Sequence, residues 1–404
     1  MAMVENKDKK VLNVPNLRFP EFEGEWEKET LGSVAKVVGG GTPDTNIQKY
    51  WNGDIQWFTP SEIGRNKYVT YSLRTISEEG LNKSSAKVLP IGTILLSSRA
   101  TVGECSINNM ECTTNQGFQS LIVNGNISNE FLFYLIQTKR KELIRKSCGS
   151  TFLEISANEV RKIKITVPVC KEQEKIGKLL ALLDSRIATQ NKIIEDLKKL
   201  KSAIIENVLN NCHNNKIQLD DVGIYIRGLT YSINDVVEQK GTIVMRSNNI
   251  DNGSLLDYSN NIVRVNKQIL QEQQLQNGDI VVCMANGSSA LVGKSSFYDG
   301  KCLSPITVGA FCGIYRSKMP ITKWLFQTSR YRRYIWNSLQ GGNGAIANLN
   351  GEDILRMSFP IPDKSRTEVC TKLFSSLDSL IENNVSLCSI LYRQKEYLLH
   401  QMFI

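Results

Sequence analysis

Residues 172–210 read EQEKIGKLLALLDSRIATQNKIIEDLKKLKSAIIENVLN, with seam residues at alternating steps of four and three. The seam positions are Ile176, Leu180, Leu183, Ile187, Gln190, Ile194, Leu197, Lys201, Ile204 and Val208. This spacing is typical of a coiled-coil helix, whose buried positions recur about every 3.5 residues. At about 1.5 Å per residue the helix would extend roughly 60 Å, too long for one face of a compact domain. The stretch therefore predicts a long helix that pairs with another helix.

The partner helix is found in the same chain, because the seam recurs 194 positions later. The shifted seam consists of Cys370, Phe374, Leu377, Ile381, Asn384, Cys388, Leu391, Lys395, Leu398 and Met402. The same offset relates Gln190 to Asn384, Lys201 to Lys395, Pro168 to Pro362, and Asp184 to Asp378. The chain is therefore predicted to be an internal duplication.

Composition and charge narrow the class of protein. A chain of 404 residues with 41% hydrophobic and 22% charged residues suits two globular domains plus extra elements. A formal net charge of +9 is compatible with a polyanionic partner and also occurs in proteins that bind none. The ten cysteines include no Cys-x-x-Cys pair and follow no secretory signal, so we expect free thiols in a cytoplasmic protein. No apolar run approaches the roughly 20 residues that cross a bilayer, and Cys212-His213 lacks the second pair that a zinc site needs.

Short strands and amphipathic helices follow one another in the same order in both halves. In the first half we expect strands at 34–38, 54–58, 93–97, 119–123 and 163–167, and a helix at 129–146. In the second half we expect strands at 221–227, 242–245, 278–282 and 357–359, and a helix at 324–339. The predicted divisions are a flexible tail at 1–13, a first domain at 14–170, a long helix at 171–212, a second domain at 213–364 and a second long helix at 365–404.

Polar and basic side chains gather where several predicted strands end. In the first domain these candidates for DNA contact are Arg65, Asn66, Lys67, Tyr68, Arg99, Asn115 and Gln116. In the second domain they are Arg246, Asn248, Asn249, Asn286 and Lys294. Side chains of these types can hydrogen-bond to base edges, and Lys294 suits a phosphate contact. For any single residue a solvated loop is the alternative interpretation.

Motifs for covalent chemistry are absent from the sequence. The segment GSSALVGKS at 287–295 is similar to a phosphate-binding P-loop, but it has one residue too many between its glycines and precedes a turn at 297–300. No Asn-Pro-Pro-aromatic tetrapeptide of an amino-methyltransferase occurs. Both histidines, His213 and His400, lie in or beside the long helices, which leaves no base for a serine or cysteine nucleophile. A nucleotide hydrolase built on Lys294 is the enzymatic alternative.

Two globular domains with different loops, each followed by a similar helix, resemble the specificity subunit of type I restriction-modification systems. The resemblance is carried by WFTPSEI at 57–63, LSSRATVG at 96–103, TNQGF at 114–118, and the junction VPVCKEQEKI at 167–176 leading to LLDSRI at 182–187. The junction is the most specific of these segments. In the second half the junction differs, because 362–366 reads PDKSR without the Glu-Gln pair, and there the match depends on the offset of 194.

The resemblance implies an α+β fold of two internally repeated globular target recognition domains separated by two long antiparallel coiled-coil helices. Each domain would read, in the major groove, one half of a bipartite target in double-stranded DNA. The paired helices would set the distance between the half-sites and dock two methyltransferase (modification) subunits, and motor-nuclease restriction subunits would complete the enzyme. S-adenosylmethionine, ATP and magnesium would bind those partners, so we expect no cofactor, metal or catalytic residue in this chain.

The pairing of the helices is assigned to apolar seam residues: Ile176, Leu180, Leu183, Ile187, Ile194, Leu197, Ile204, Val208, Phe374, Leu377, Ile381, Leu391 and Leu398. The seam lysines Lys201 and Lys395 would fix the register of the helices or would meet a carboxylate of a docked partner, and the sequence supports both. A coiled-coil scaffold protein without DNA binding is the alternative to the DNA-recognition hypothesis.

Overall fold

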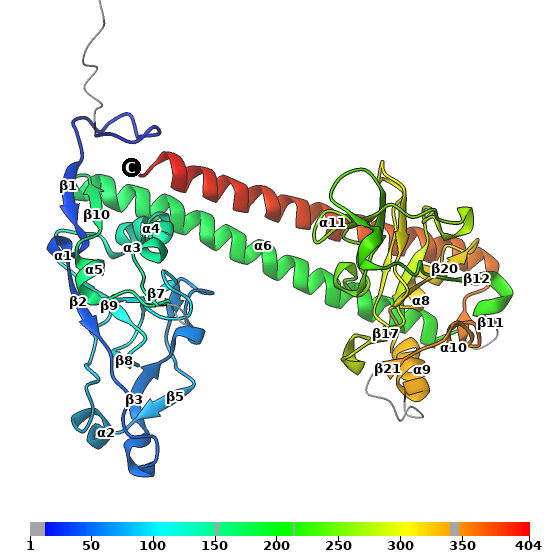
Figure 1. Ribbon diagram of the computed structural model, residues 1–404, viewed down its shortest axis with the longest axis horizontal. Helices are drawn as coiled ribbons and strands as arrows, with labels where there is room; N and C mark the ends of the chain where they lie inside the picture. Colours follow the sequence, from blue (N-terminus) through cyan, green and yellow to red (C-terminus); the bar gives the residue numbers. More distant parts are fainter. Residues whose placement is uncertain (1–12, 150–152, 213–214, 340–346) are drawn as a thin grey trace, which may run out of the picture. The chain divides into compact units, whose positions relative to one another are not determined.

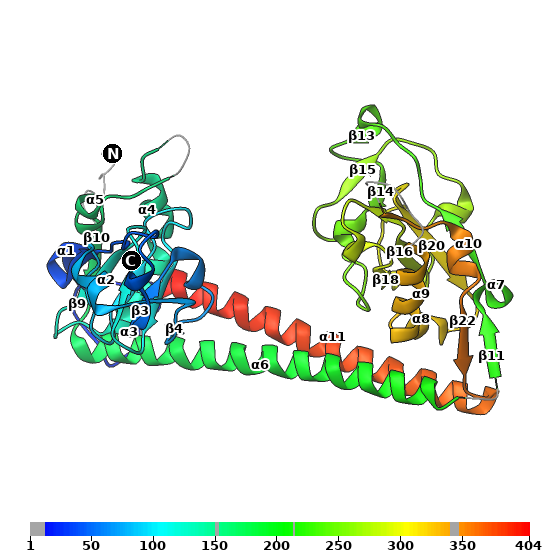
Figure 2. The ribbon, with the colours of Figure 1, turned by 90° about the horizontal axis from the view of Figure 1, so that it is seen from below.

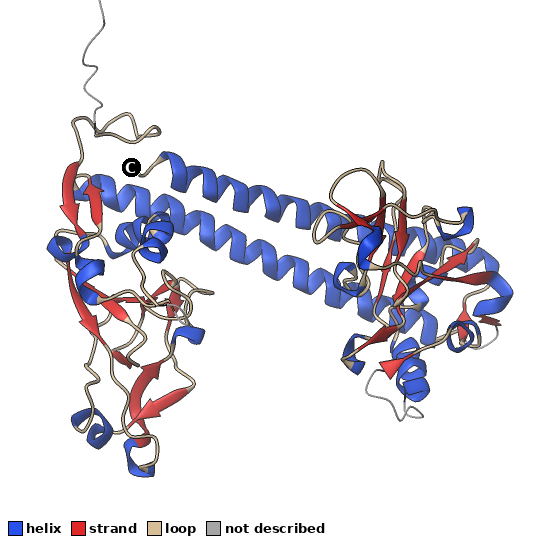
Figure 3. Cartoon of the chain, in the orientation of Figure 1, coloured by secondary structure: helices blue, strands red, loops and turns tan. Residues whose placement is uncertain are grey.

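The computed structural model of the chain describes residues 13–149, 153–212, 215–339 and 347–404. The predicted tail up to residue 12, and His213 at the start of the predicted second domain, lie outside the described residues. The chain divides into two compact units. Unit 1 comprises Met1–Asn191 and Ser386–Ile404, and unit 2 comprises Lys192–Val385. Each unit therefore contains one globular domain and one segment of each long helix (Figures 1 and 3).

The globular domain of unit 1 contains a five-stranded and a three-stranded sheet. The first has the order β2-β9-β6-β7-β4, formed by Ala35–Gly39, Gln119–Val123, Ile94–Leu96, Cys105–Asn108 and Tyr68–Val69. The second has the order β5-β3-β8, formed by Arg74–Ile76, Trp51–Phe58 and Cys112–Thr114. Strands β3 and β8 are parallel, which brings their C-terminal residues Phe58 and Thr114 side by side. Strand β1 (Glu27–Thr30) pairs antiparallel with β10 (Lys164–Val167).

The described helices of this domain are α1 (Leu31–Val34), α2 (Glu78–Asn82), α3 (Asn129–Thr138), α4 (Arg140–Arg145) and α5 (Ala157–Arg161). The prediction of one continuous helix at 129–146 is wrong, because two helices, α3 and α4, occupy this stretch. The chain leaves helical geometry at Lys139 (φ −88°, ψ 2°), whose ammonium group donates to the carbonyl of Ile404 at 2.8 Å. The domain core packs Phe131 of α3 against Trp26 and against Phe403 near the chain's C-terminus.

The globular domain of unit 2 contains two four-stranded sheets. One has the order β12-β20-β16-β18, formed by Gly223–Arg227, Cys312–Ser317, Ile280–Cys283 and Ser295–Phe297. The other has the order β13-β15-β14-β19, formed by Val236–Val237, Val263–Val265, Thr242–Met245 and Ile306–Val308. Two further pairs are β11 (Asn215–Gln218) with β22 (Ser358–Ile361) and β17 (Ala285–Asn286) with β21 (Ala347–Asn348).

The helices of the second domain also correct two predicted boundaries. They are α7 (Leu219–Val222), α8 (Thr322–Leu325), α9 (Ser329–Leu339) and α10 (Gly351–Leu355). The strand predicted at 221–227 begins only at Gly223, because α7 occupies the preceding turn. The helix predicted at 324–339 is interrupted, because the Thr328 hydroxyl accepts the backbone N–H of Tyr331 and starts a new helix there.

The two domains share one strand order, as the internal repeat predicts. The order β2-β9-β6-β7 in unit 1 corresponds to β12-β20-β16-β18 in unit 2, and the pair β1·β10 corresponds to β11·β22. The parallel pair β3·β8 corresponds to the parallel pair β14·β19. The duplication and the α+β fold class are therefore confirmed.

The two long helices are α6 (Cys170–Asn210) and α11 (Lys364–Gln401), and their segments lie side by side in each unit (Figures 1 and 2). Of the predicted seam residues, Ile176, Leu180, Leu183, Ile187, Phe374, Ile381 and Leu391 are buried, whereas Ile194, Leu197, Ile204, Val208, Leu377 and Leu398 are partly exposed. In unit 2 the deepest positions of α6 are Ile205 and Leu209, one residue beyond the predicted ones, because they join the core of the globular domain. No described helix is long and apolar enough to span a membrane.

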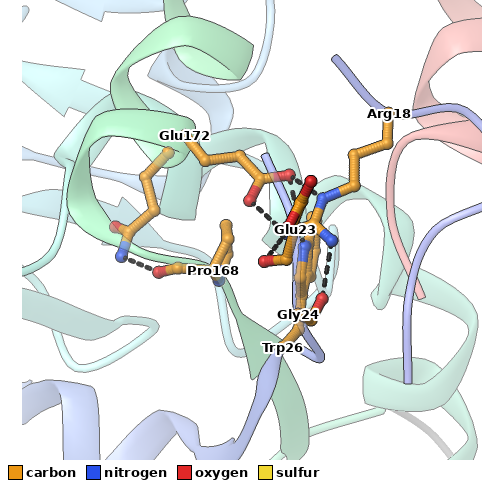
Figure 4. A network of polar contacts seen from close by, with 7 residues as sticks. Arg18, Glu23, Gly24, Trp26, Pro168 and Glu172 are labelled. Carbon is orange, nitrogen blue, oxygen red and sulfur yellow. Dashed lines mark hydrogen bonds and ion pairs between the residues drawn. The ribbon is translucent and has the colours of Figure 1, made fainter. Parts of the chain in front are cut away.

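The start of α6 is fixed to its domain by a buried carboxylate (Figure 4). The Glu172 side chain is fully buried and accepts two hydrogen bonds of 2.8 Å from the Arg18 guanidinium and a longer one from the Trp26 indole. The neighbouring Gln173 amide donates to the carbonyl of Pro168 at 2.8 Å and accepts the backbone N–H of Ser128. The Glu-Gln pair of the junction therefore joins the helix to both ends of the domain.

Candidate nucleic-acid interface

In unit 1 the loops that follow β3, β6 and β8 meet at one place. The backbone N–H of Asn115 donates to Phe58 O at 3.0 Å, and that of Ser98 donates to Gly117 O at 2.8 Å. A fourth loop, after β2, joins them tightly: a Cβ atom on Gly40 would lie 2.1 Å from Asn115 O, so only glycine fits. The glycine run at 39–41 is thus needed for loop packing, and the polar loop residues are brought together from segments far apart in the sequence.

Five of the predicted contact residues of the first domain lie on these loops with accessible side chains. Arg65, Asn66 and Gln116 are exposed, and the Gln116 amide oxygen accepts the Thr42 hydroxyl. The Asn115 side-chain oxygen accepts the backbone N–H of Gly117 at 2.9 Å, which leaves its amide group for another partner. Arg99 forms an ion pair with Glu154 at 2.8 Å while two-fifths of its side chain stays exposed. These groups could donate hydrogen bonds to a ligand.

Lys67 and Tyr68 both contact helix α3, with the Lys67 side chain largely buried and Tyr68 41% exposed. The Lys67 ammonium lies 2.9 Å from the Glu130 carboxylate of α3 and 4.9 Å from the centre of the Tyr134 ring. The Tyr68 hydroxyl donates to the same carboxylate, and burial together with this bond raises the pKa of Tyr68. The structure therefore gives both side chains partners within the domain.

In unit 2 the corresponding loops meet in the same way. They follow β14, β16 and β19, and the β14 loop forms a 3₁₀ turn at Ser247–Asn249, as the β3 loop does at Pro60–Glu62. The Asn286 amide donates to the Ser247 hydroxyl at 3.3 Å. The backbone N–H of Met284 donates to Phe311 O at 2.8 Å. The repeat has thus placed equivalent loops at equivalent strand ends in both domains.

The five predicted residues of the second domain have different surroundings. Asn248 is exposed, and Arg246 and Asn286 are partly exposed beside it. Asn249 is buried, and its amide donates to the carbonyls of Asp257 and Asn260 while its oxygen accepts the N–H of Arg246. These bonds use both amide hydrogens and one of the two acceptor positions of the oxygen, so Asn249 shapes the loop. Lys294 is partly exposed and lies in the loop that precedes β18, apart in the sequence from the other four residues.

An apolar groove in the second domain escaped the sequence analysis. It encloses about 640 Å³ and includes Arg246, Asn248, Tyr231, Ile233 and Phe311 in its wall. Ile233 and Phe311 are largely exposed, at 87% and 67%. Exposed apolar side chains of this size beside polar loop residues make the groove a candidate contact surface. Phe311 stands two residues after Gly309, which follows β19, but this local sequence gives no sign that its ring is exposed.

Arginine residues of both domains form a second group that sequence reasoning missed. In unit 1 the Arg74 guanidinium lies 3.6 Å from the centre of the Trp51 ring. In unit 2 helix α9 exposes Arg332, Arg333 and Trp336, and its buried residue Ile335 lies against Gly293, next to Lys294. The sequence feature that could have indicated α9 as a contact surface is a run of basic residues with a tryptophan at helical spacing.

The P-loop alternative finds no support in the local fold. The backbone after Lys294 enters strand β18 (Ser295–Phe297), whereas a P-loop opens directly into a helix whose N–H groups bind phosphate. Gly293 has positive φ (81°) because its N–H and carbonyl are bonded to Cys283 and Tyr331. Within the described residues no three His, Cys, Asp or Glu side chains are grouped as metal ligands, and His213 lies outside them.

Comparison with known proteins shows which class of protein this chain is similar to. The sequence model of the "Type I restriction modification DNA specificity domain" matches residues 23–199, so this part of the chain is similar to that domain. The specificity subunit of the type I restriction enzyme MjaIX of Methanocaldococcus jannaschii is 36% identical over 187 residues, which are 45% of this chain and 43% of that protein. The EcoR124I/EcoR124II specificity subunit of Escherichia coli is 31% identical over 190 residues, 45% of this chain and 46% of that one.

The match in structure is wider than the match in sequence. The crystal structure of the type I restriction-modification S subunit from M. genitalium covers 97% of this chain and 99% of its own, with a TM-score of 0.58 at 14% identity, so the fold is shared. The aligned sequence spans less than half the length of the curated relatives. The first half of the chain is therefore similar in sequence to type I restriction enzyme specificity subunits, and the chain as a whole shares the fold of the M. genitalium S subunit.

Proposed function

We propose that the chain is the non-catalytic DNA sequence-recognition subunit of a type I restriction-modification enzyme. The observation that carries the proposal is the duplication of one loop arrangement. In both domains the loops after a parallel strand pair and after the neighbouring sheet strand present arginine and amide side chains together. Arginine and asparagine or glutamine are the side chains that read guanine and adenine edges in the major groove.

Each domain would read one half of a bipartite target in double-stranded DNA. Two similar readers on one duplex need half-sites on matching faces, about one helical turn or roughly 34 Å apart. The paired helices α6 and α11 would set this spacing and dock two methyltransferase subunits. The restriction subunits would join the same complex, and S-adenosylmethionine, ATP and magnesium would bind the partner subunits in the cytoplasm.

Methylome sequencing of the source cell with and without this gene tests the proposal. We expect adenine methylation at one split motif, two short half-sites around a fixed gap, to disappear when the gene is deleted. Restoring the gene should restore the motif. An unchanged methylome, in cells that express both the chain and a methyltransferase partner, would refute the proposal and favour the coiled-coil scaffold without DNA binding.

Single substitutions then assign the half-sites to the domains. Arg99→Ala should weaken base preference in one half-site, and Asn286→Ala should weaken it in the other, because each removes a donor from one domain's loops. Asn249→Ala serves as the contrast, since it should lower stability without a selective loss at one base pair. If Arg99→Ala leaves affinity and preference unchanged, Arg99 is not a reading residue.

A further inference from the structure

In unit 2 a buried aspartate of α11 collects groups from three elements. The Asp378 carboxylate lies 2.9 Å from the ammonium of Lys201 on α6 and 2.8 Å from that of Lys323 on α8. It also accepts a hydrogen bond of 3.1 Å from the indole of Trp324 on α8. The Asp378 and Lys201 side chains are almost fully buried. We call this group, Asp378, Lys201, Lys323 and Trp324, the unit 2 junction.

In unit 1 an aspartate of α6 has the same role. The Asp184 carboxylate lies 2.7 Å from the ammonium of Lys395 on α11 and accepts the Tyr134 hydroxyl of α3 at 2.7 Å. Burial and this hydrogen bond raise the pKa of Tyr134, so the hydroxyl stays a donor. The Lys395 ammonium also lies 5.6 Å from the centre of the Tyr134 ring. We call this group, Asp184, Lys395 and Tyr134, the unit 1 junction.

The two junctions are related by the internal repeat. Asp378 lies 194 positions after Asp184, and Lys395 lies 194 positions after Lys201. In each unit an aspartate of one long helix therefore binds the seam lysine of the other helix and an aromatic donor of the globular domain. Buried charges are costly unless they are paired and hydrogen-bonded, and isolated polar seam positions serve to select one register. Both seam lysines find their carboxylate within the chain.

Each junction also contacts a neighbouring segment of its domain. This segment follows, in the chain, the loop that carries the first candidate DNA-contact residues. In unit 2 the Lys201 ammonium donates to Gly253 O at 3.2 Å, and Leu255 bridges in parallel to Phe297 of β18. In unit 1 the equivalent segment is β4, which pairs in parallel with β7, and its neighbour Lys67 lies over the Tyr134 ring. Equivalent loops thus touch equivalent junctions in both domains.

We propose that the two junctions are positioning devices that hold each recognition domain at one orientation on its own helix pair. They would thereby limit the distances between half-sites that the protein accepts. This inference rests on the proposed function. Lys201, Lys395, Asp184 and Asp378 act here as positioning residues and make no contact with DNA. A variant that loses a junction should accept wrong gap lengths while each domain still reads its own bases.

The test uses the chain assembled with its methyltransferase partner and duplexes that carry both half-sites with the native gap or a gap one base pair longer or shorter. Wild-type binding to the native duplex, with rejection of the other gaps, is established first and stands or falls with the proposed function. In Lys395→Met we expect the preference for the native gap to fall about fivefold, equivalent to about 1 kcal/mol. Preference among half-site bases should stay unchanged.

Two matched variants separate positioning from general stability. Lys395→Arg keeps a cation opposite Asp184 and should retain the native gap preference. Lys199→Met removes an exposed lysine of α6 whose partner Glu195 is four residues away, and it should change nothing. Lys395 is partly exposed at 19%, so Lys395→Met should still fold. A folded Lys395→Met protein with native gap preference, or one that loses base preference together with gap preference, would overturn the proposal.

Discussion

The pair Arg18 and Glu172 offers a direct test of how the first domain is joined to α6 (Figure 4). Arg18→Ala removes both donors of 2.8 Å and leaves the Glu172 carboxylate without its cation. The Glu172 side chain has no exposed surface, whereas 16% of the Arg18 side chain is exposed. The remaining side-chain partner is the Trp26 indole at 3.4 Å, which cannot compensate a full charge.

The expected loss of stability follows from the difference in burial between the Glu172 and Arg18 side chains. Removing one partner of a fully buried ion pair costs about 3–5 kcal/mol, because the other charge stays desolvated. Arg18 lies at the edge of the site, so water can reach part of the space it leaves, and we expect about 2–3 kcal/mol. For a unit of this size each kcal/mol lowers the melting temperature by about 2–4 °C. Arg18→Ala should therefore lower the melting transition of unit 1 by roughly 4–12 °C.

The measurement is thermal unfolding of the full chain, with hydrogen exchange across β1 and β10 as a local report. The double variant Arg18→Ala/Glu172→Gln decides the cause, because it removes the stranded charge and should be more stable than Arg18→Ala. Lys175→Ala is the control, since it removes a half-exposed ion pair with Glu21 in the next turn of the helix and should leave the transition unchanged. A double variant no more stable than Arg18→Ala would refute the buried-charge argument.

Three further predictions concern the thiols and the DNA surface. At pH 8 a thiol reagent should modify the exposed Cys148 and Cys170 but not Cys105 or Cys112 until the chain unfolds, because burial raises the pKa of both buried thiols to about 12; mass spectrometry of native and unfolded protein checks this. The double variant Arg332→Ala/Arg333→Ala should lower the slope of log DNA affinity against log salt concentration by about 2 without changing sequence preference. The control Arg356→Ala, which removes a surface charge already paired with Glu352, should leave this slope unchanged. Equal slopes for the double variant and the wild type would exclude α9 from the interface. Replacing thymine by deoxyuridine in the half-site of the second domain should weaken wild-type binding several-fold at the position that meets Phe311, as expected for a lost methyl contact, and Phe311→Ala should abolish the difference; no sensitive thymine at any position would contradict it.

The long helices and the repeat were predictable because they depend on periodicity. A step of 3.5 residues and an offset of 194 are properties of the sequence itself, and both survive in α6, α11 and the shared strand order. The details that failed depend on tertiary contacts. Ile205 replaces Ile204 at the deepest position because the globular core lies on that side of α6, and Lys139 ends α3 where its ammonium meets the C-terminal carbonyl. Periodicity carries no information about either contact.

The candidate reading residues could be found by type and place, but their orientation could not. Strand-end position predicted loops that touch: the backbone N–H of Asn115 donates to the carbonyl of Phe58 at the end of β3, and Arg65 and Asn66 lie further along the loop that follows β3. The same rule also selected Asn249, whose three hydrogen bonds close its own loop, and Lys67, which faces Glu130. An asparagine that ends a 3₁₀ turn is a local signal for such closure. Neither the apolar groove nor the exposure of Phe311 follows from local sequence, because both depend on distant loops.

Under the proposed function, the duplication explains how the two domains could differ in the bases that they read. The residues that the repeat keeps alike are those of the helix seam, the aspartate–lysine junctions and the strand order. The residues that differ lie in loops: the first domain carries Arg99 and Gln116, whereas the second carries Arg246 and Asn248 in the wall of the groove that includes Phe311. Loop side chains at strand ends contribute little to the cores below them, so they can change without loss of the frame. If each domain reads one half-site as proposed, a frame fixed by buried charges and seams would allow two unlike half-sites to be read by one chain.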